Sequence, residues 1–372
     1  MQQILITIPP GLPIYGYGMM LFLAFVLCSW LGIRLGRRVG IAPEVFKDLA
    51  LWLFIFGILG ARVFYFIFEA KEFPTPWKFI AIWDGGLIFY GSMFGGIVGF
   101  LVADFLMQRK FPYDRWKLFD CVAPCIALGL ALGRIGCLLN GCCFGDVACA
   151  HCPAITFPIP SPPRYTMVDR GYQTTAGFTV ERDKPRVVEF VEPGSAAAAG
   201  LLAGDVIVKV NGVDIASDEA LHYAFRAWPR GKNDLTLTAE RPDGLKTLTF
   251  SPRTIGLHPS QIYETISMLL LLFFLTSYFP YRAADGILMV ILMFAYGIHR
   301  FLNEMLRTDT EKVSFDMTLS QNISILVILG GFVLAIAVYR HAQSKANSTL
   351  ASNAGFDSSC PFSAQGKSAR SF

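Results

Sequence analysis

Arg134 is the residue that first suggests chemistry, because it lies at the end of an apolar stretch that begins near Leu118. It belongs to a segment at residues 133–145 that also contains Asn140. A charged side chain at membrane depth is costly, and it usually marks a site for an ion or a polar substrate. We therefore interpret Arg134 as part of a pocket for an anion near the bilayer surface. The alternative is an arginine that snorkels to the surface without binding a ligand.

Arg300, Glu304 and Arg307 are spaced four and three residues apart, so they lie on one face of a predicted helix. Glu304 can hold one arginine in place while another guanidinium stays available for a phosphate. The alternative is a structural ion pair. Glu264 lies one turn inside another apolar segment, where a buried carboxylate needs a donor or a cation. Arg134 is a candidate partner for Glu264.

The segment at residues 258–264 starts with His258 and Pro259, directly before an apolar run. Proline favours an extended residue before it, and Ser260 can cap the amides of the following helix, so a structural interpretation as a helix start stays open. Further polar residues lie close to the ends of other apolar runs; they are Tyr17, Arg62, Tyr90 and Asn140.

These residues must be positioned by membrane helices. The chain has 372 residues, of which 53% are hydrophobic and 16% charged, and its mean hydropathy is +0.48. This composition predicts an integral membrane protein. Apolar runs long enough to cross about 30 Å of hydrocarbon occur at residues 15–31, 49–68, 86–105, 118–139, 262–279, 286–302 and 319–338. We therefore predict a polytopic α-helical protein with about seven transmembrane helices.

Basic residues in the short connections predict the orientation, since Lys and Arg accumulate on the cytoplasmic side. They follow the first, third, fifth and last predicted spans, as in Arg37, Arg109 and Arg282. The amino terminus is therefore predicted outside and the carboxyl terminus in the cytoplasm, with the first helix as an uncleaved signal-anchor. The formal net charge of +4 is too small to indicate nucleic acid as a partner.

Five of the nine cysteines are crowded into one stretch that is predicted to lie outside: Cys137, Cys142, Cys143, Cys149 and Cys152. Disulfides persist outside the cytoplasm, and two separated C-x-x-C pairs are absent from this stretch. Bridging is therefore favoured over a zinc site, and an odd cysteine can remain free. Cys28, Cys121 and Cys125 lie in apolar helices, where cysteine is usually a small core residue.

Residues 171–252 differ from the rest, because polar residues and alternating patterns replace the long apolar runs. Strands are predicted at residues 187–191, 206–210, 235–240 and 245–250, and a helix capped by Ser217 at residues 217–228. The predicted organisation is a membrane domain at 1–152, a linker at 153–170, a small β-rich domain at 171–252, the rest of the membrane domain at 253–340 and a disordered cytoplasmic tail at 341–372.

The run at residues 192–212 closely resembles the bacterial PDZ family. PDZ domains bind an extended peptide as an added strand at a sheet edge, beside a helix. The resemblance implies a small PDZ-like domain with a peptide or protein ligand, a groove bordered by the helix near residues 218–228, and a carboxylate-binding loop at residues 177–180. The alternative is a folded spacer whose groove is blocked.

The membrane segments resemble the prolipoprotein diacylglyceryl transferase family in three motifs. They are the glycine-arginine motif at residues 133–145, the His-Pro-Ser-Gln-Leu-Tyr-Glu motif at residues 258–264 with Ile262 for leucine, and the Arg-Phe-x-x-Glu-x-x-Arg motif at residues 300–307. The resemblance implies transfer of a diacylglyceryl group from phosphatidylglycerol to the lipobox cysteine thiol of a prolipoprotein signal peptide. It also implies release of glycerol phosphate, no metal or organic cofactor, and a place in the bacterial cytoplasmic (inner) membrane.

We expect a mechanism that needs a thiolate and a stabilised phosphate leaving group, and in this mechanism the residues have the following roles. Arg134 and Arg300 grip the lipid phosphate and offset its developing charge. A tyrosine or histidine helps to remove the thiol proton, with Tyr90 and His258 as candidates. Tyr17 joins this catalytic set, and the other substrate-binding residues are Arg62, Asn140, Gly145, Glu264, Glu304 and Arg307.

The chain departs from the family pattern at Tyr90, where many members carry histidine, at Cys137, where they carry asparagine, and at Cys142, where they carry glutamate. A phenol titrates near pH ~10, so Tyr90 is better suited to polarising or positioning a group than to deprotonating it. Two other functions remain as alternatives. One is a non-catalytic receptor for lipid or lipoprotein that recruits partners through the PDZ-like domain, and the other is an intramembrane protease with Ser92 and His299 as a dyad.

Overall fold

The computed structural model of this chain consists of long helices and four small β-sheets among the residues it describes. Those residues are 4–8, 12–68, 89–149, 151–157, 161, 163, 166–167, 172–174, 178–181, 184, 186–191, 193, 197, 200–226, 234–250, 256–307, 312–314 and 316–357.

In this part of the chain, seven helices have the length and hydropathy needed to cross a bilayer. They are α1 (Gly16–Arg38), α2 (Pro43–Phe68), α4 (Phe89–Lys110), α5 (Arg115–Asn140), α8 (Ser260–Tyr278), α9 (Ile287–Glu304) and α10 (Leu319–Asp357). Each overlaps one predicted apolar run, so the polytopic helical class is confirmed. The helices extend beyond the runs where polar residues can continue a turn, as at the start of α2, where Pro43 and Glu44 suit the first helical positions.

The chain divides into two compact units, and each is described by itself. The first contains Met1–Cys28, Ala127–Leu270 and Ile298–Ser324, and the second contains Ser29–Ile126, Leu271–Gly297 and Ile325–Phe372. Helices α1, α5, α8, α9 and α10 contribute residues to both units. Among the site residues predicted from sequence, Arg62 and Tyr90 belong to the second unit and the others to the first.

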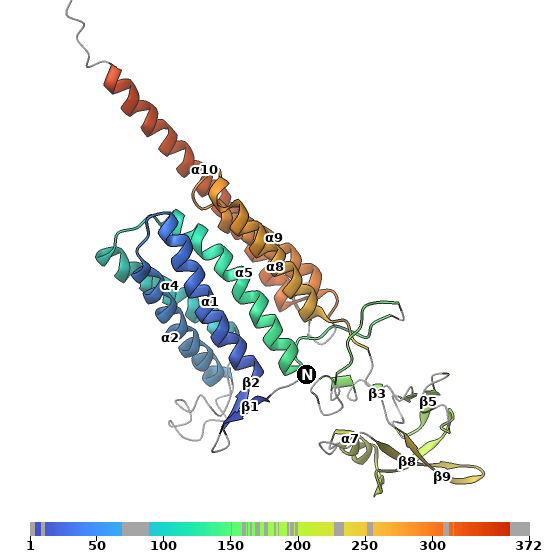
Figure 1. The fold of residues 1–372 in the computed structure, drawn as a ribbon. Helices are drawn as coiled ribbons and strands as arrows, with labels where there is room; N and C mark the ends of the chain where they lie inside the picture. Colours follow the sequence, from blue (N-terminus) through green and yellow to red (C-terminus); the bar gives the residue numbers. More distant parts are fainter. Residues whose placement is uncertain are drawn as a thin grey trace, which may run out of the picture. The chain divides into compact units, whose positions relative to one another are not determined.

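In the second unit, α2 and α4 lie side by side (Figure 1). Glycines allow the two backbones to approach closely. A Cβ added to Gly95 of α4 would lie 2.1 Å from the carbonyl oxygen of Phe56, and one added to Gly60 of α2 would lie 2.3 Å from that of Gly91. Small residues at helix contacts are the usual means of tight packing within a membrane.

The start of α9 is fixed within the second unit by the buried side chain of Asp120 on α5. Its carboxylate accepts hydrogen bonds from the amides of Gly286, at 2.8 Å, and Leu288, at 2.9 Å. Nε of Arg282 lies 2.9 Å from the same carboxylate. A carboxylate that accepts the free amides of a helix amino terminus also complements the helix dipole, so Asp120 anchors α9 to α5.

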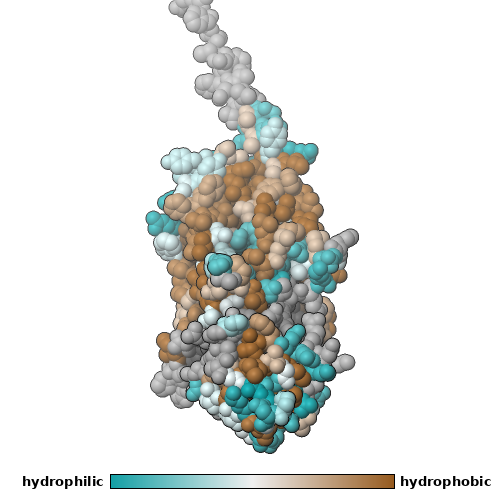
Figure 2. Space-filling view, turned by 90° about the vertical axis from the view of Figure 1, so that its right-hand side faces the viewer, coloured by the Kyte–Doolittle hydropathy of each residue, from teal (hydrophilic) through white to brown (hydrophobic). Residues whose placement is uncertain are grey.

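The large apolar side chains of the long helices are widely exposed, including Phe22 of α1, Phe54 of α2, Leu101 of α4, Phe273 of α8 and Val333 of α10. In the space-filling view of one face, hydrophobic residues dominate the surface over the long helices (Figure 2). Contiguous apolar surface on this scale is rare in soluble monomers. It is the surface expected of helices that face lipid chains.

The described residues of the inserted region form two sheets and one helix. A three-stranded sheet has the order β3 (Tyr172–Thr174), β4 (Phe178–Val180), β5 (Val188–Val191). A four-stranded sheet has the order β7 (Val213–Asp214), β6 (Val206–Val210), β8 (Leu235–Arg241), β9 (Gly244–Phe250), and α7 spans Asp218–Arg226. The predicted strands, helix and β8–β9 hairpin are thus present. All neighbouring strands in both sheets are antiparallel.

Local signals set these elements. Asn211 and Gly212 have positive φ angles of 51° and 84°, which a tight turn between β6 and β7 requires. The Ser217 hydroxyl accepts a hydrogen bond of 3.2 Å from the amide of Ala220, so the predicted helix cap is confirmed. Residues of the strands and of α7 build one apolar core, which includes Ile207 of β6, Leu221 of α7, and Leu235 and Leu237 of β8.

The remaining described strands form two short hairpins, β1 (Ile4–Ile8) with β2 (Leu12–Tyr15) and β10 (Lys312–Ser314) with β11 (Met317–Thr318). The helix α10 is longer than predicted, because it continues past Arg340 to Asp357, whereas a disordered tail was predicted from residue 341. An established helix is extended at little cost by residues such as Ala and Lys. Residues 358–372 of that tail lie outside the described residues.

Candidate active site

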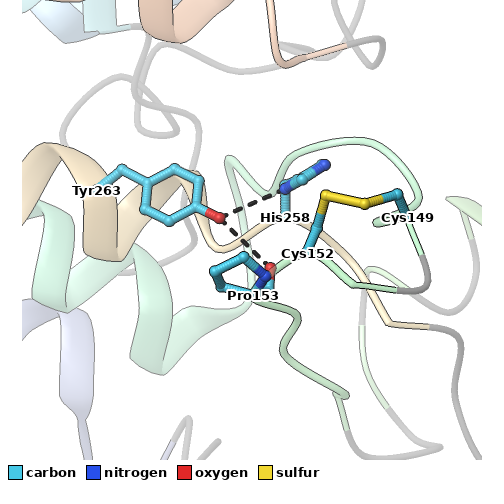
Figure 3. The surroundings of a disulfide bond; sticks show 5 residues. All are labelled: Cys149, Cys152, Pro153, His258 and Tyr263. Atoms are coloured by element: carbon cyan, nitrogen blue, oxygen red, sulfur yellow. Dashed lines mark hydrogen bonds between the residues drawn. A yellow bond between two sulfur atoms is a disulfide. The ribbon is translucent and has the colours of Figure 1, made fainter.

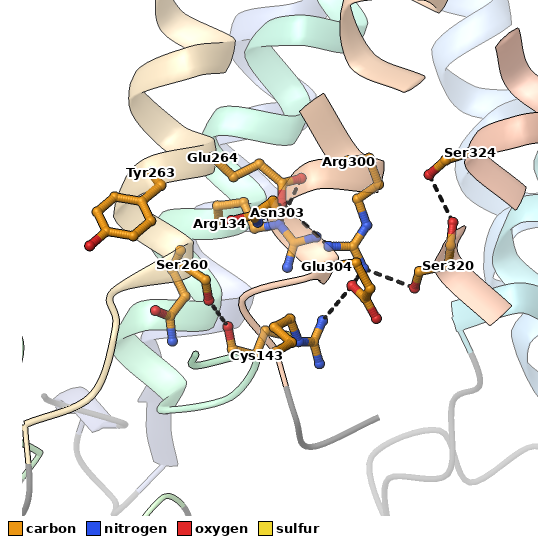
Figure 4. A network of polar contacts seen from close by, with 12 residues as sticks. Arg134, Cys143, Ser260, Tyr263, Glu264, Arg300, Asn303, Glu304, Ser320 and Ser324 are labelled. Carbon is orange, nitrogen blue, oxygen red and sulfur yellow. Dashed lines mark hydrogen bonds and ion pairs between the residues drawn. The ribbon is translucent and has the colours of Figure 1, made fainter. Parts of the chain in front are cut away.

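Glu264 lies at the centre of a group of ionisable residues in the first unit, which we call the ion-pair cluster: Arg134, Glu264, Arg300, Glu304 and Arg307 (Figure 4). Oε1 of Glu264 is 3.0 Å from Nε of Arg134, and its Oε2 is 3.6 Å from Nη1 of Arg300. The expected pairing of Glu264 with Arg134 is therefore present. One carboxylate connects arginines that come from α5 and α9.

Glu304 is the second carboxylate of the cluster. Its Oε2 is 2.7 Å from Nη2 of Arg300 and 3.5 Å from Nη1 of Arg307, so the expected contacts are present. The predicted common helix face holds only for Arg300 and Glu304, because α9 ends at Glu304 and Arg307 lies just beyond it. The hydroxyl of Thr318 donates to Oε1 of Glu304 at 3.3 Å. Nη2 of Arg300 also donates to the hydroxyl of Ser320 at 2.9 Å (Figure 4). Thr318 at the end of β11 (Met317–Thr318) and Ser320 in the first turn of α10 thus help to hold the cluster.

The helix directions explain why these residues meet. Arg134 and Arg300 lie near the carboxyl ends of α5 and α9, and Glu264 lies near the amino end of α8. Consecutive membrane spans run in opposite directions, so the end of one span lies beside the start of the next. The side chains of Glu264 and Glu304 are fully buried, and those of the three arginines are nearly so. Low exposure strengthens each charge interaction compared with water.

The cluster keeps capacity for a further anion. Three guanidinium groups face two carboxylates, which leaves one excess positive charge. Nη1 of Arg300 is buried and makes no hydrogen bond to the described residues, because its contact of 3.6 Å with Oε2 of Glu264 is too long. A buried donor without an acceptor is costly, so this nitrogen can bind a ligand oxygen at a net gain.

Asn303 belongs to this site, although the sequence did not single it out. Its side chain is buried, and its Nδ2 donates to Oε2 of Glu264 at 3.0 Å. Asn303 follows Arg300 by three residues, so helical spacing places both on neighbouring positions of one face. That spacing is the signal that could have identified it. His299 is also near the cluster, and its buried Nε2 has no hydrogen-bond partner among the described residues.

The loop after α5 is fixed by the first turn of α8. The hydroxyl of Ser260 donates to the carbonyl of Cys143 at 2.6 Å (Figure 4), and Nε2 of Gln261 donates to that of Cys142 at 2.8 Å. Ser260 thus holds the loop, whereas a helix cap was considered from sequence. Gly145 donates its amide to the carbonyl of His258 at 2.8 Å, and an added Cβ would lie 2.6 Å from the Cβ of His258. Only glycine fits there.

The hydrogen-bond partner of the His258 side chain is a tyrosine and not a residue of the ion-pair cluster. Its Nδ1 is 3.4 Å from the hydroxyl of Tyr263, which also donates to the carbonyl of Pro153 at 3.3 Å (Figure 3). The disulfide between Cys149 and Cys152 lies beside this group (Figure 3). In the part of the chain that the structure describes, His258 therefore contacts a tyrosine and the outer loop rather than the ion-pair cluster.

The other predicted residues lie at different places. Tyr17 is partly exposed at the start of α1, and a Cβ on Gly136 would lie 3.0 Å from its ring, so Tyr17 packs on α5. Asn140 ends α5 and forms a hydrogen bond with Cys142. Arg62 is buried in α2 of the second unit, with its guanidinium 5.7 Å from the ring centroid of Tyr65. The backbone of Tyr90 begins α4, and its side chain lies outside the described residues.

The cysteines divide into two groups. Cys149 and Cys152 form a disulfide, so the predicted bridging is confirmed for this pair. Cys137, Cys142 and Cys143 are unbridged, and their sulfur atoms all lie within 4.8 Å of one another. Hydrogen bonds from the thiols of Cys137 and Cys142, helped by the nearby guanidinium of Arg134, hold the pKa of Cys143 well below its usual range. Sequence spacing did not show that these three residues converge.

Comparison with known proteins places the chain in a family. The sequence model of "Prolipoprotein diacylglyceryl transferase" matches residues 3–337. The chain belongs to this family. The resemblance carried by the three membrane motifs is therefore confirmed.

Relatives agree with membership of the diacylglyceryl transferase family. A protein of Rhodopirellula baltica is 29% identical over 92% of this chain and 75% of its own length. Proteins of Synechococcus elongatus and Synechocystis are 39% and 35% identical, over 38% and 36% of this chain and 47% of their own lengths. All three carry the name phosphatidylglycerol–prolipoprotein diacylglyceryl transferase. With its seven apolar helices, this chain is a multi-pass membrane member of a transferase family.

Proposed function

We propose that this chain transfers the diacylglyceryl group of phosphatidylglycerol to the lipobox cysteine thiol of a prolipoprotein, with the lipid phosphate bound at the ion-pair cluster. The products are a thioether and glycerol phosphate. Family membership and the names of the relatives support the reaction. The chemistry of the cluster supports the site.

One observation supports binding of the lipid phosphate at the ion-pair cluster. The cluster has one excess positive charge and a buried Arg300 nitrogen without a hydrogen bond to the described residues. The phosphodiester of phosphatidylglycerol carries one negative charge and free oxygen acceptors. Arginine suits phosphate because its planar donors match the spacing of the phosphate oxygens. A lipid headgroup therefore satisfies both the charge and the free donor.

The reaction breaks the bond between a glyceryl carbon and a phosphate oxygen. Negative charge increases on the phosphate as this bond breaks, and Arg134 and Arg300 stabilise that charge. Glu264 and Glu304 hold the two arginines, Asn303 holds Glu264, and Arg307 completes the neutralisation of Glu304. Because these groups are fixed before the substrate binds, little reorganisation opposes the reaction.

The other residues predicted from the sequence have supporting roles in the proposed reaction. Tyr17 and Asn140 flank the loop after α5, and Gly145 permits the close contact of that loop with His258. The role of Arg62 in headgroup binding stays a prediction. Tyr90 and His258 stay predictions as acceptors of the thiol proton. The acyl chains remain between helices, in contact with the bilayer.

We further propose that the cluster faces the outer leaflet of the bacterial inner membrane, with the amino terminus outside and the carboxyl terminus in the cytoplasm. Basic residues end α1, as Arg37 and Arg38, and α4, as Arg109 and Lys110, and such residues favour the cytoplasmic side. The Cys149–Cys152 disulfide lies in the connection between α5 and α8, and disulfides persist outside the cytoplasm.

The inserted region is proposed to be a PDZ-like domain. Its strand and helix order agrees with the sequence resemblance at residues 192–212. However, residues 178–180 of the proposed carboxylate-binding loop form β4, which pairs with β3 on one edge and with β5 on the other. A peptide that adds as a strand to β4 must displace β3, so the pairing favours a spacer with a blocked groove over a peptide receptor. Gly177 of that loop lies outside the described residues.

A transfer assay tests the proposed function. The purified chain is supplied with phosphatidylglycerol and a lipobox peptide, and the peptide mass is followed. We expect transfer, and we expect Arg134→Ala and Arg300→Ala to reduce its rate by roughly 100- to 1000-fold, as for other groups that stabilise developing charge. Arg282→Ala is the matched control, because Arg282 is also a buried arginine paired with carboxylates, in the second unit.

Circular dichroism and membrane fractionation of each variant separate a lost fold from lost chemistry. Unchanged transfer in both cluster variants would reject the roles of Arg134 and Arg300. Binding of lipid and peptide by the wild-type chain without any transfer would instead support the non-catalytic receptor. The protease alternative predicts peptide cleavage, and the family assignment speaks against it.

A further inference from the structure

Cys137, Cys142 and Cys143 form a compact group of thiols at the carboxyl end of α5. Their sulfur atoms lie within 4.8 Å of one another, and each side chain is partly exposed. An odd number of thiols cannot be consumed by pairwise bridging, and none of the three is bridged. We propose that these cysteines bind one Zn²⁺ ion through three thiolates, and that the fourth zinc position receives the thiol that is to be alkylated.

The spacing of the sulfur atoms suits zinc. A tetrahedral zinc ion has Zn–S bonds of about 2.3 Å, which places its sulfur ligands roughly 3.8 Å apart. The thiols need only small rotations to reach that geometry from separations below 4.8 Å. Three protein ligands with one open position are the usual arrangement of a catalytic zinc ion, whereas structural zinc sites are closed by a fourth protein ligand.

The backbone holds these ligands in place. The amide of Cys142 donates to the carbonyl of Cys137 at 3.0 Å, and the side chains of Ser260 and Gln261 bind the carbonyls of Cys143 and Cys142. Cys143 has a φ of 59°, a left-handed conformation that is strained for a non-glycine residue and persists only where the surrounding structure imposes it. A loop fixed in this way keeps the cysteines converged, which is what a metal site requires.

The surrounding charges suit an anionic zinc–thiolate complex. Arg134 precedes Cys137 by one helical turn on α5, and both Arg134 and Arg307 interact electrostatically with Cys143. These arginines would repel a bare cation. Three thiolates and one Zn²⁺ carry a net negative charge, however, which the guanidinium groups stabilise. The same arginines thus serve the zinc complex and the lipid phosphate.

The proposed zinc ion would help to deprotonate the substrate thiol. The thiolate, rather than the thiol, is the nucleophile, and a thiol that binds a metal is deprotonated. Tyr90 is a weak base near neutral pH, and His258 contacts Tyr263 rather than the cluster in the described structure. Zinc bound at Cys137, Cys142 and Cys143 would activate the substrate thiol one helical turn from Arg134.

The alkylation of the zinc-bound thiol rests on the proposed function, and each bond and proton in it can be followed. The lipobox thiol binds zinc and gives its proton to water at the membrane surface. Its sulfur forms a bond to the glyceryl carbon, the carbon–oxygen bond breaks, and the electron pair stays on the phosphate oxygen of the leaving glycerol phosphate. The neutral thioether is a weaker zinc ligand than a thiolate, so the product leaves. Negative charge moves from sulfur to phosphate beside the same arginines.

Metal content tests the zinc site without reference to activity. The full chain, purified in detergent, is treated with a chelator, given Zn²⁺, desalted and analysed by mass spectrometry of metals. We expect one zinc per chain, and a fall to roughly a tenth or less in Cys142→Ser and Cys143→Ser, since loss of a ligand weakens binding more than the 10–100-fold seen for outer-shell changes. Cys125→Ser, in the same helix, is the matched control and should keep its zinc.

Replacement of Zn²⁺ by Co²⁺ tests whether the peptide thiol binds at the fourth position of the metal. Tetrahedral Co²⁺ bound by three thiolates absorbs visible light, and we expect a cysteine-containing lipobox peptide to change that spectrum, whereas the same peptide with serine should not. Equal zinc content in the wild-type chain and both cysteine variants would overturn the site. So would mass spectrometry that finds a disulfide between two of these cysteines and no bound metal.

The two proposals can fail separately. If the metal-free chain and the cysteine variants transfer the diacylglyceryl group at the wild-type rate, the zinc proposal is wrong and the transferase function stands. If the chain binds zinc and the peptide thiol changes the Co²⁺ spectrum, yet no diacylglyceryl transfer occurs under any condition, the metal site stands and the transferase function is wrong.

Discussion

Oε1 of Glu264 lies 3.0 Å from Nε of Arg134; the side chain of Glu264 is fully buried, and that of Arg134 is 15% exposed. The two residues come from α8 and α5 and form an ion pair in the first unit. Removal of two charges from water is costly, and their attraction offsets that cost only where further partners complete the geometry. Asn303 and Arg300 supply those partners at the second oxygen of Glu264.

Glu264→Gln should destabilise the protein and reduce transfer. The amide keeps the shape of the side chain, but Arg134 and Arg300 lose the charge that they share. Breaking one side of a buried ion pair costs about 3–5 kcal/mol, so we expect a clearly lower thermal unfolding temperature in detergent. Glu44→Gln is the control, because Glu44 is exposed and its contact with Lys47 is 4.0 Å long. Equal unfolding temperatures for the two variants would contradict this prediction.

Asn303→Ala should leave the fold intact and lower transfer. Without the amide, Oε2 of Glu264 loses a donor at 3.0 Å, at a cost of about 1–3 kcal/mol. We expect kcat/KM for phosphatidylglycerol to fall at least about tenfold, since Glu264 then holds the arginines less firmly. Asn303→Asp should be worse, because it places a like charge beside Glu264. Asn322→Ala, which removes a bond from α10 to Thr318, is the control; a similar loss there would indicate a general effect of amide removal.

Gly95→Ala and Gly96→Ala form a matched pair of changes in α4. A Cβ on Gly95 would lie 2.1 Å from the carbonyl oxygen of Phe56, whereas one on Gly96 would have no heavy atom within 4 Å. The first change forces α2 and α4 apart, and overpacking of this kind costs about 1–3 kcal/mol or more. The second should be neutral or slightly stabilising, because alanine favours helix more than glycine does. Unfolding in increasing denaturant would measure both, and equal effects would refute the close packing.

The inserted domain should lose stability in acid through Asp205. Burial alone would raise the pKa of Asp205, but the bonds from Arg241 and from the amide of Leu202 outweigh it and hold the pKa below the usual value. A carboxyl with a lowered folded pKa contributes stability that is present above its unfolded pKa of about 3.9 and is lost as pH falls through the folded pKa.

Hydrogen exchange of β6 in the full chain, recorded from about pH 5 to about pH 3, would measure this loss once the intrinsic exchange rate is subtracted. We expect protection to fall with pH in the wild-type chain. Asp205→Asn should show weaker protection at the higher pH and little further change, because the titrating group is gone. A wild-type pH dependence retained in Asp205→Asn would exclude Asp205 as its source.

Sequence patterns predicted the elements of this protein well where the signal is local. Apolar runs of span length gave the seven helices, and alternation with turn residues gave β6, β8 and β9. The cap at Ser217 and the contacts of Glu304 with Arg300 and Arg307 also follow from spacing within a few residues. Such features depend on backbone periodicity, which each segment carries by itself.

Local patterns were insufficient where the end of a helix, or the contact that a side chain makes, depends on residues distant in the sequence. The helix α10 continues beyond the predicted boundary at Arg340, because an apolar run marks only the part of a helix that lies in lipid. The sequence also did not show that His258, a candidate acceptor of the thiol proton, lies 3.4 Å from the hydroxyl of Tyr263. Ser260 was a candidate helix cap, and it binds the carbonyl of Cys143 instead.

The sequence by itself determined the number of spans, the family and the need of Glu264 for a cation, since hydropathy, motif residues and the cost of a buried charge are all present in the linear chain. Only the tertiary structure decided that Asn303 shares that carboxylate with Arg134, and that Cys137, Cys142 and Cys143 converge while Cys149 bridges to Cys152. These choices depend on which helix ends meet and on the direction each side chain takes there, and residue spacing along one helix does not specify either.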